Sequence, residues 1–280
     1  MNSTLIIARL TFREAVRRRI VLTAILLGIS FLIIYSIGFH MITVQVSKTV
    51  PKQINTLASS EGYNFLVLAG LYTITFLSIA MAALISADTL AGEINSGTIQ
   101  TVVTKPLRRA DVVLGKWIGF AILLALYLTL MAGGVIVSVW LQSGYSPPHV
   151  LGGIALIYLE SLLIMSLTLL CSSKLSALAT GGVVFGLYGL SFIGGWVEQI
   201  GSLLQNQTAV NVGIVSSLII PSEALWRRAA FEMQSPLSTV LRMSPFGATS
   251  VPSPLMIAYA GLYALVALAL TFRLFARRDL

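Results

Sequence analysis

The sequence predicts an all-α polytopic membrane protein with six transmembrane helices, organised as a single domain over residues 1–280. Hydrophobic residues make up 56% of the chain and charged residues only 10%, whereas a soluble domain is about 45–50% apolar and about 25% charged. The mean hydropathy is +0.90. So few charges would not cover a soluble globule, which excludes a soluble enzyme, a nucleic-acid-binding domain and a disordered chain.

Six apolar runs are long enough to cross a bilayer, because about 20 apolar residues span the ~30 Å of hydrocarbon. They carry almost no charge and lie at about residues 20–39, 64–86, 115–141, 150–171, 177–196 and 255–275. The further run Val212–Ile220 is too short to span and ends at Pro221. We therefore expect it to be re-entrant or interfacial.

The residues before the first span predict a helix that lies in the membrane surface. Arg9, Arg13 and Arg17 repeat every four residues and share one helical face, which would turn toward anionic headgroups. The apolar positions of another face are Leu5, Ala8, Phe12, Ala15 and Val16. The alternative is a simple basic flank of the first span.

The distribution of basic residues predicts the orientation of the chain. The net charge is +8, and 13 of the 18 Lys and Arg residues fall on the side that holds both termini and the 87–114 loop. Because cytoplasmic loops carry the excess of Lys and Arg, we expect both termini to be cytoplasmic.

The loop between the second and third spans predicts a short helix that is bent at both ends. Gly97 is a natural helix stop, and Thr98 can cap a new helix over Ile99–Val103. Pro106 prevents that helix from continuing, and Asp111 can cap the third span. Such an element is a stiff lever suited to a groove of a partner, and the alternative is an ordinary charged loop.

The largest loop, residues 198–254, predicts short helices between the fifth and sixth spans. Its clearest segment is an amphipathic helix over residues 223–232. Pro221 and Ser222 supply the start of this helix, with Ser222 as the N-cap.

Two features within the spans are candidates for function. Glu160 is an acid well inside the fourth span, which is costly in a bilayer. It is either a substrate-path or proton-linked group, or a neutral carboxyl hydrogen-bonded to Ser161, Ser166 or a neighbouring helix. Gly182 and Gly186 form a Gly-x-x-x-Gly that permits close helix packing, within the bundle or between subunits, although glycine is also simply frequent in membrane helices.

Missing motifs argue against an enzyme. A phosphate loop needs Gly-x-x-x-x-Gly-Lys followed by Ser or Thr, whereas Gly115-Lys116 is followed by Trp117 and preceded at the first glycine position by Ala110. No catalytic triad, zinc signature or dinucleotide fingerprint is readable. The two histidines, His40 and His149, lie far apart in the sequence, and no cysteine or acidic cluster stands at ligand spacing, so we expect no metal site. We also expect no cofactor in this chain.

Several of these segments together resemble bacterial ABC-2-type transport permeases, above all the six-span group similar to the permease of nitrous oxide reductase maturation. The signature residues are Asp88, Glu93, Gly97, Thr98, Pro106, Arg109, Gly115 and Lys116. Further family features are the opening Ala8–Ala15, which includes Phe12, Arg13 and Glu14, the segment from Glu160 to Ser176, the run Ile220–Arg227 and the closing Phe275–Asp279. Arg9, Phe12, Arg13, Glu14 and Arg17 are the residues assigned to the interfacial helix.

The resemblance implies a prokaryotic plasma-membrane permease subunit of an ATP-driven transporter, with export as its direction. ATP and Mg would bind in a separate ATP-binding subunit, and a second permease chain, identical or a sister, would complete the complex. The loop between the second and third spans would hold the coupling helix. The residues assigned to that coupling are Asp88, Glu93, Gly97, Thr98, Pro106, Arg108 and Arg109.

Other functions stay open from the sequence. A stand-alone secondary transporter is one alternative, and a force-transmitting membrane scaffold is another. The substrate classes compatible with the resemblance include lipids, peptides, drugs, polysaccharides and sulfur species.

Overall fold

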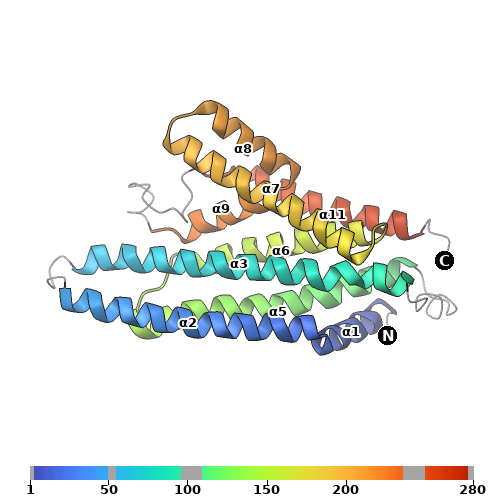
Figure 1. Ribbon diagram of the computed structural model, residues 1–280, viewed down its shortest axis with the longest axis horizontal. Coiled ribbons are helices and arrows are strands. Elements are labelled where there is room, and N and C mark those ends of the chain that lie inside the picture. The colour runs from blue at the N-terminus through green and yellow to red at the C-terminus, as the bar shows by residue number, and fades with distance from the viewer. Residues whose placement is uncertain (1–2, 50–54, 96–108, 236–249, 277–280) are drawn as a thin grey trace.

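The computed structural model describes residues 3–49, 55–95, 109–235 and 250–276, and within these ranges it contains nine helices and no strand (Figure 1). The helices are α1 (Ser3–Arg17), α2 (Arg19–Thr49), α3 (Asn55–Asn95), α5 (Arg109–Ser143), α6 (Val150–Ser172), α7 (Ala177–Leu203), α8 (Gln207–Ile219), α9 (Ser222–Met233) and α11 (Leu255–Ala276).

The six predicted spans are confirmed as α2, α3, α5, α6, α7 and α11, each long and apolar enough to cross a membrane. Several extend beyond their predicted limits. α3 has 41 residues and is therefore about 60 Å long, twice the thickness of the hydrocarbon. Hydropathy detects only the apolar middle of such a helix, because polar residues at its ends can stay helical in water.

Both termini lie at the same end of the bundle, as an even number of spans requires (Figure 1). We call this the terminal end, where α3 ends at Asn95 and α5 begins at Arg109. We call the opposite end, where α2 ends at Thr49 and α6 begins at Val150, the far end.

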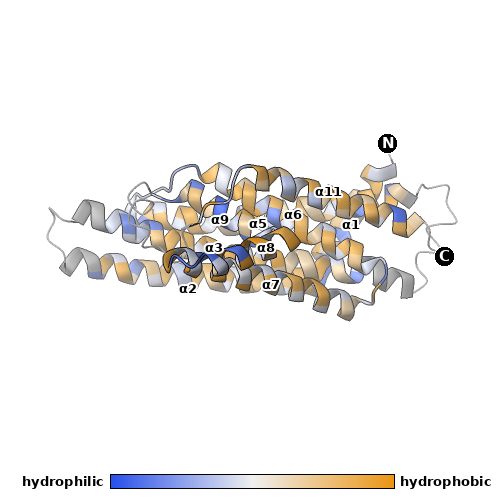
Figure 2. Cartoon of the chain, turned by 90° about the horizontal axis from the view of Figure 1, so that it is seen from above, coloured by the Kyte–Doolittle hydropathy of each residue, from blue (hydrophilic) through white to orange (hydrophobic). Residues whose placement is uncertain are grey.

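The centre of the bundle is formed by α3, α5 and α6. Fully buried side chains include Leu68 and Ile74 of α3, Phe120 and Leu124 of α5, and Ile164 of α6. Hydrophobic residues predominate along the helices (Figure 2), and many large apolar side chains are exposed, among them Leu26 of α2, Leu126 of α5 and Leu265 of α11. This pattern is expected where lipid rather than water surrounds the bundle.

The helices α8 and α9 form a hairpin bent by 108°. At the bend, the carbonyl of Ile220 accepts a hydrogen bond of 2.9 Å from the hydroxyl of Ser191, near the midpoint of α7. At the other end of α9, the carbonyl of Met233 accepts one of 2.9 Å from Asn64. The hairpin thus enters the helix bundle from the far end and returns, which is the geometry of a re-entrant segment.

The predicted helix over residues 223–232 is confirmed as α9, but the prediction that Ser222 is its N-cap is wrong. Pro221 occupies the N-cap position, and Ser222 is the first helical residue. The bend is buried, so the Ser222 hydroxyl bonds the Ser191 hydroxyl at 3.3 Å instead of an amide of its own helix.

Glycines allow the hairpin to lie directly against α7. A Cβ at Gly194 would collide with Ser216 of α8, and a Cβ at Gly195 would collide with Glu223 of α9. In contrast, no atom of the described residues lies within 4 Å of a Cβ built at Gly182 or Gly186. The close packing expected of these two is therefore not made within this chain, and their contact with a second chain stays a prediction.

Candidate coupling site

The helix α1 is held against the first half of α5 by small residues. Ala8, Thr11 and Ala15 form its buried face. A Cβ built at Gly115 would lie 2.7 Å from the Cβ of Ile7, and one at Gly119 would lie 2.8 Å from the carbonyl oxygen of Ala8. These distances leave no room for a side chain, so the two glycines are required for this contact.

The faces of α1 differ from those expected from the sequence. The large apolar residues are outside, with Leu5 57% and Leu10 60% exposed. Ala8 and Ala15 of the predicted apolar face are buried, but Phe12 is only half-buried. The reason is that close helix packing in a membrane selects small residues, while large apolar side chains can face lipid.

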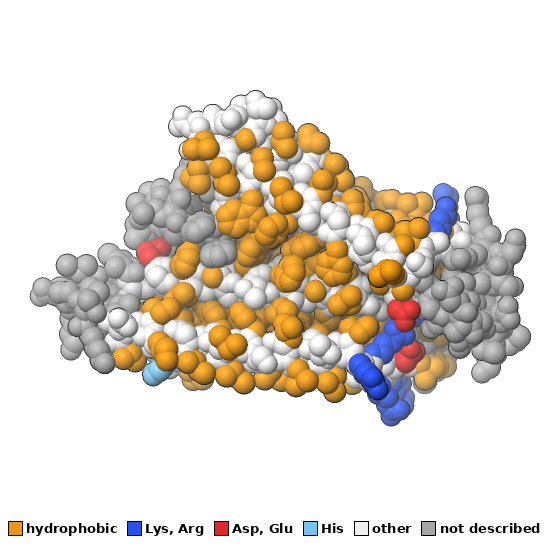
Figure 3. Space-filling model, viewed as in Figure 1, with side chains coloured by type: hydrophobic (Ala, Val, Ile, Leu, Met, Phe, Trp, Pro, Cys, Tyr) orange, Lys and Arg blue, Asp and Glu red, His pale blue; other side chains and the backbone are white. Residues whose placement is uncertain are grey.

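The basic residues Arg9, Arg13 and Arg17 are exposed, and their contact with anionic headgroups stays a prediction. In the space-filling view, Lys and Arg side chains gather at the terminal end (Figure 3). Glu14 is also exposed and belongs to the charged junction described next.

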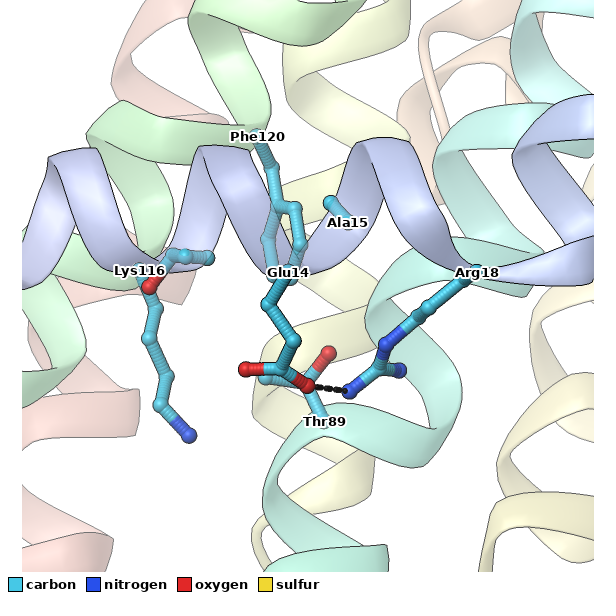
Figure 4. Close-up of a pocket in the computed structure, with 7 residues that line it drawn as sticks. Glu14, Ala15, Arg18, Thr89, Lys116 and Phe120 are labelled. Carbon is cyan, nitrogen blue, oxygen red and sulfur yellow. Dashed lines mark hydrogen bonds and ion pairs between the residues drawn. The ribbon is translucent and has the colours of Figure 1, made fainter.

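A charged junction joins the break between α1 and α2 to α3 and α5. The Arg18 guanidinium donates a hydrogen bond of 2.7 Å to Glu14, and it lies 3.9 Å from the carboxylate of Asp88 in α3. Thr89 of α3 and Lys116 of α5 are buried next to this pair. Figure 4 shows the side chains of Glu14 and Arg18 meeting beside Thr89, around a void no larger than a water molecule.

A second tie joins α1 to the start of α5. The hydroxyl of Thr4 donates a hydrogen bond of 3.2 Å to the carboxylate of Asp111. The prediction that Asp111 is the N-cap of the third span is wrong, because α5 already begins at Arg109. Asp111 lies instead in the first helical turn, where its charge interacts favourably with the helix dipole.

The structure tests only part of the predicted coupling set. Glu93 lies in the last turn of α3 and Arg109 is the first residue of α5, but their side chains are outside the described residues. Four further members of the set also lie outside the described residues, namely Gly97, Thr98, Pro106 and Arg108. The same holds for the predicted helix over Ile99–Val103. The described junction therefore adjoins both ends of the predicted coupling segment.

Glu160 lies near the midpoint of α6 and is fully buried. Neither of its carboxyl oxygens has a hydrogen-bond partner among the residues that the structure describes. The two serines considered as partners bond elsewhere, since Ser161 donates to the carbonyl of Ile157 and Ser166 to that of Leu162. Glu223 of α9, a helix that packs against α6, is a second buried carboxyl of this bundle.

A buried ion pair at the far end of the bundle was not predicted from the sequence. Arg227 of α9 and Glu198 of α7 lie 2.5 Å apart, and their side chains are only 3% and 5% exposed. In the sequence, both residues read as ordinary loop or helix-end charges. Only the spacing of Glu223 and Arg227, four residues apart on one face of α9, hints that this helix carries a buried polar stripe.

Comparisons with known proteins agree with this architecture. The model of the family described as "ABC-2 family transporter protein" matches residues 5–280. A curated relative from Stutzerimonas stutzeri, named a probable ABC transporter permease protein, NosY, is 40% identical over 52 residues. That match covers 19% of this chain and 19% of the relative.

Proposed function

The chain belongs to the ABC-2 family of transporter proteins, and from this premise we propose that it is an unpowered gate driven by a separate ATP-binding subunit. It is a multi-pass membrane permease of that family. The observation that carries the proposal is the terminal-end junction, where α1, α3 and α5 are tied together beside both ends of segment 96–108.

The proposed mechanism uses these contacts to transmit motion from the partner subunit to the bundle. ATP and Mg bind in the partner subunit, whose closure displaces segment 96–108. That segment continues directly from α3 and leads directly into α5, so both central spans receive the displacement. The glycine contacts at Gly115 and Gly119 make α1 move with α5. ATP hydrolysis can shift the helix bundle between two conformations only because the ATP-binding subunit makes different contacts with each of them.

The orientation proposed for the chain places the terminal end in the cytoplasm of a prokaryote. The excess of Lys and Arg at that end supports this orientation. The exposed arginines of α1, beside exposed Leu5 and Leu10, fit a helix at the headgroup level of the inner leaflet.

A second permease chain, identical or a sister, completes the proposed complex, and the direction of transport is export. Gly182 and Gly186 are exposed on α7 with no described neighbour within 4 Å. Paired glycines at this spacing let two helices approach closely in lipid, which makes this face of α7 the proposed contact with the second chain.

The proposal is tested by purifying the tagged chain from native membranes and measuring ATP hydrolysis by the complex. Glu93→Arg reverses the charge at the proposed contact and is expected to abolish both co-purification of an ATP-binding subunit and hydrolysis. The control is Gln207→Arg, which also introduces an arginine, with a charge change of +1 rather than +2, at the exposed start of α8 at the far end. ATP hydrolysis by the chain alone would overturn the proposal, and normal coupling in Glu93→Arg would overturn the assigned contact.

A further inference from the structure

A cavity of about 480 Å³ lies at the far end of the bundle, between α7, the α8–α9 hairpin and the start of α11. Its size is within the range of ligand pockets, about 300–1,000 Å³. Leu218 of α8 and Leu255 and Met256 of α11 form apolar walls. Leu218 is 52% and Leu255 79% exposed, so the cavity opens sideways, toward the lipid that surrounds a membrane bundle.

One wall of this cavity is polar and built around the buried ion pair. Arg227 and Glu198 both line it, together with Ser217 and Ser250. Arg227 donates a hydrogen bond of 3.2 Å to the Ser217 hydroxyl, and Ser250 donates one of 2.7 Å to Glu198. Four side chains from α7, α8, α9 and the segment before α11 therefore converge on one point.

These contacts leave hydrogen-bonding groups of both residues unsatisfied. Within the described residues, Nε and Nη1 of Arg227 and Oε2 of Glu198 make no hydrogen bond, although Nη1 takes part in the ion pair with Glu198. Both side chains are more than nine-tenths buried, and buried charged groups are normally satisfied by hydrogen bonds. A ligand that brings an acceptor to Arg227 and a donor to Glu198 would satisfy both groups.

We infer that this cavity binds a zwitterionic phospholipid with a primary ammonium, of the phosphatidylethanolamine type. The phosphate would bind at Arg227, the ammonium at Glu198, and an acyl chain along Leu218 and Met256. Because the two protein charges cancel, the polar wall is net neutral and selects a headgroup that carries both signs over a purely anionic one. The inference rests on the membrane placement of the chain and is independent of its coupling to ATP.

The test uses the full chain purified into nanodiscs that contain phosphatidylethanolamine, phosphatidylcholine or phosphatidylglycerol, with retained lipid measured by native mass spectrometry after detergent transfer. Phosphatidylethanolamine is expected to be retained about tenfold better than phosphatidylglycerol, the ratio that corresponds to one charge-assisted hydrogen bond. Phosphatidylcholine, whose quaternary ammonium donates no hydrogen bond, is expected to be intermediate.

Two variants separate the cavity from general lipid adhesion. Leu218→Trp fills the cavity and is expected to remove the preference, whereas Ile219→Trp adds the same ring at the neighbouring exposed position, which does not line the cavity. Glu198→Gln keeps the shape but leaves Arg227 uncompensated, so the preference is expected to shift toward phosphatidylglycerol.

Equal retention of the three lipids by the unmodified chain would overturn the inference. So would a preference that survives in Leu218→Trp or that Glu198→Gln leaves unchanged. None of these measurements involves ATP, so their failure is distinguishable from a failure of the proposed transport function.

Discussion

The contact between α1 and α5 gives the sharpest test of the coupling site, through the substitution Gly119→Ala. A Cβ at this position would lie 2.8 Å from the carbonyl oxygen of Ala8 and 3.0 Å from the Cβ of Thr11. The first of these neighbours is backbone, so α1 must move by several tenths of an ångström to accommodate the methyl group. Overpacking of this kind costs about 1–3 kcal/mol.

Gly119→Ala also stabilises the helix α5 itself, and a matched control variant corrects for this effect. Gly→Ala inside a helix stabilises it by about 1 kcal/mol. Gly133→Ala gives this benefit alone, because Gly133 lies on the same helix with nothing described within 4 Å of its Cβ. The difference between the two variants isolates the contact, and about 1–3 kcal/mol corresponds to a shift of about 5- to 150-fold in the docking equilibrium of α1.

Disulfide trapping measures that equilibrium directly. The hydroxyl of Thr4 and the carboxylate of Asp111 lie 3.2 Å apart, so Thr4→Cys with Asp111→Cys should cross-link α1 to α5 in a background where Cys171 is changed to Ser. Gly119→Ala is expected to slow the cross-link at least about fivefold relative to Gly133→Ala. Equal rates in the two variants would refute the assignment of Gly119 as a required close contact.

Three further substitutions test other contacts. Glu160→Gln is expected to leave assembly intact and to alter transport or coupled ATPase activity in reconstituted complexes, and unchanged turnover would reduce Glu160 to a packing role. Asp88→Asn is expected to lower the free energy of unfolding by less than about 1 kcal/mol, because the ion pair of Asp88 with Arg18 is partly exposed. It is also expected to increase the number of ATP molecules consumed per substrate molecule moved. An unchanged ratio of ATP to substrate would show that this ion pair has no role in coupling. Glu198→Ala leaves the Arg227 charge buried and unpaired, and is expected to destabilise the protein by about 3–5 kcal/mol; an unchanged melting temperature in detergent would contradict the ion pair.

The spans were predictable because they depend on one property only. An apolar run of sufficient length crosses the bilayer as a helix whatever its detailed sequence, since a helix satisfies its backbone hydrogen bonds within the segment itself. The ends of the spans were less predictable. Residues such as Glu61 and Asp88 are polar, yet they continue α3 without interruption, because a helix in water needs no apolar side chains to persist.

The contact faces were not predictable from hydrophobicity, because lipid and protein interior are equally apolar. In α1 the buried face consists of Ala8, Thr11 and Ala15, while larger apolar residues are exposed. In the same way, Gly115 and Gly119 pack against a helix, but Gly182 and Gly186, at identical spacing, have no described neighbour. The glycine spacing shows that close approach is possible, and only the fold shows where it occurs.

The two ends of the bundle are built for different mechanical roles. At the terminal end the ion pairs of Arg18 join residues that are partly exposed, and such pairs break and re-form at little cost. At the far end the pair of Glu198 and Arg227 is buried, and glycines on α7 bring the α8–α9 hairpin into direct backbone contact. Breaking that pair costs several kcal/mol. A displacement applied at the terminal end would therefore shift α3 relative to α1 and α5, which move together, while α7, α8 and α9 move as one body.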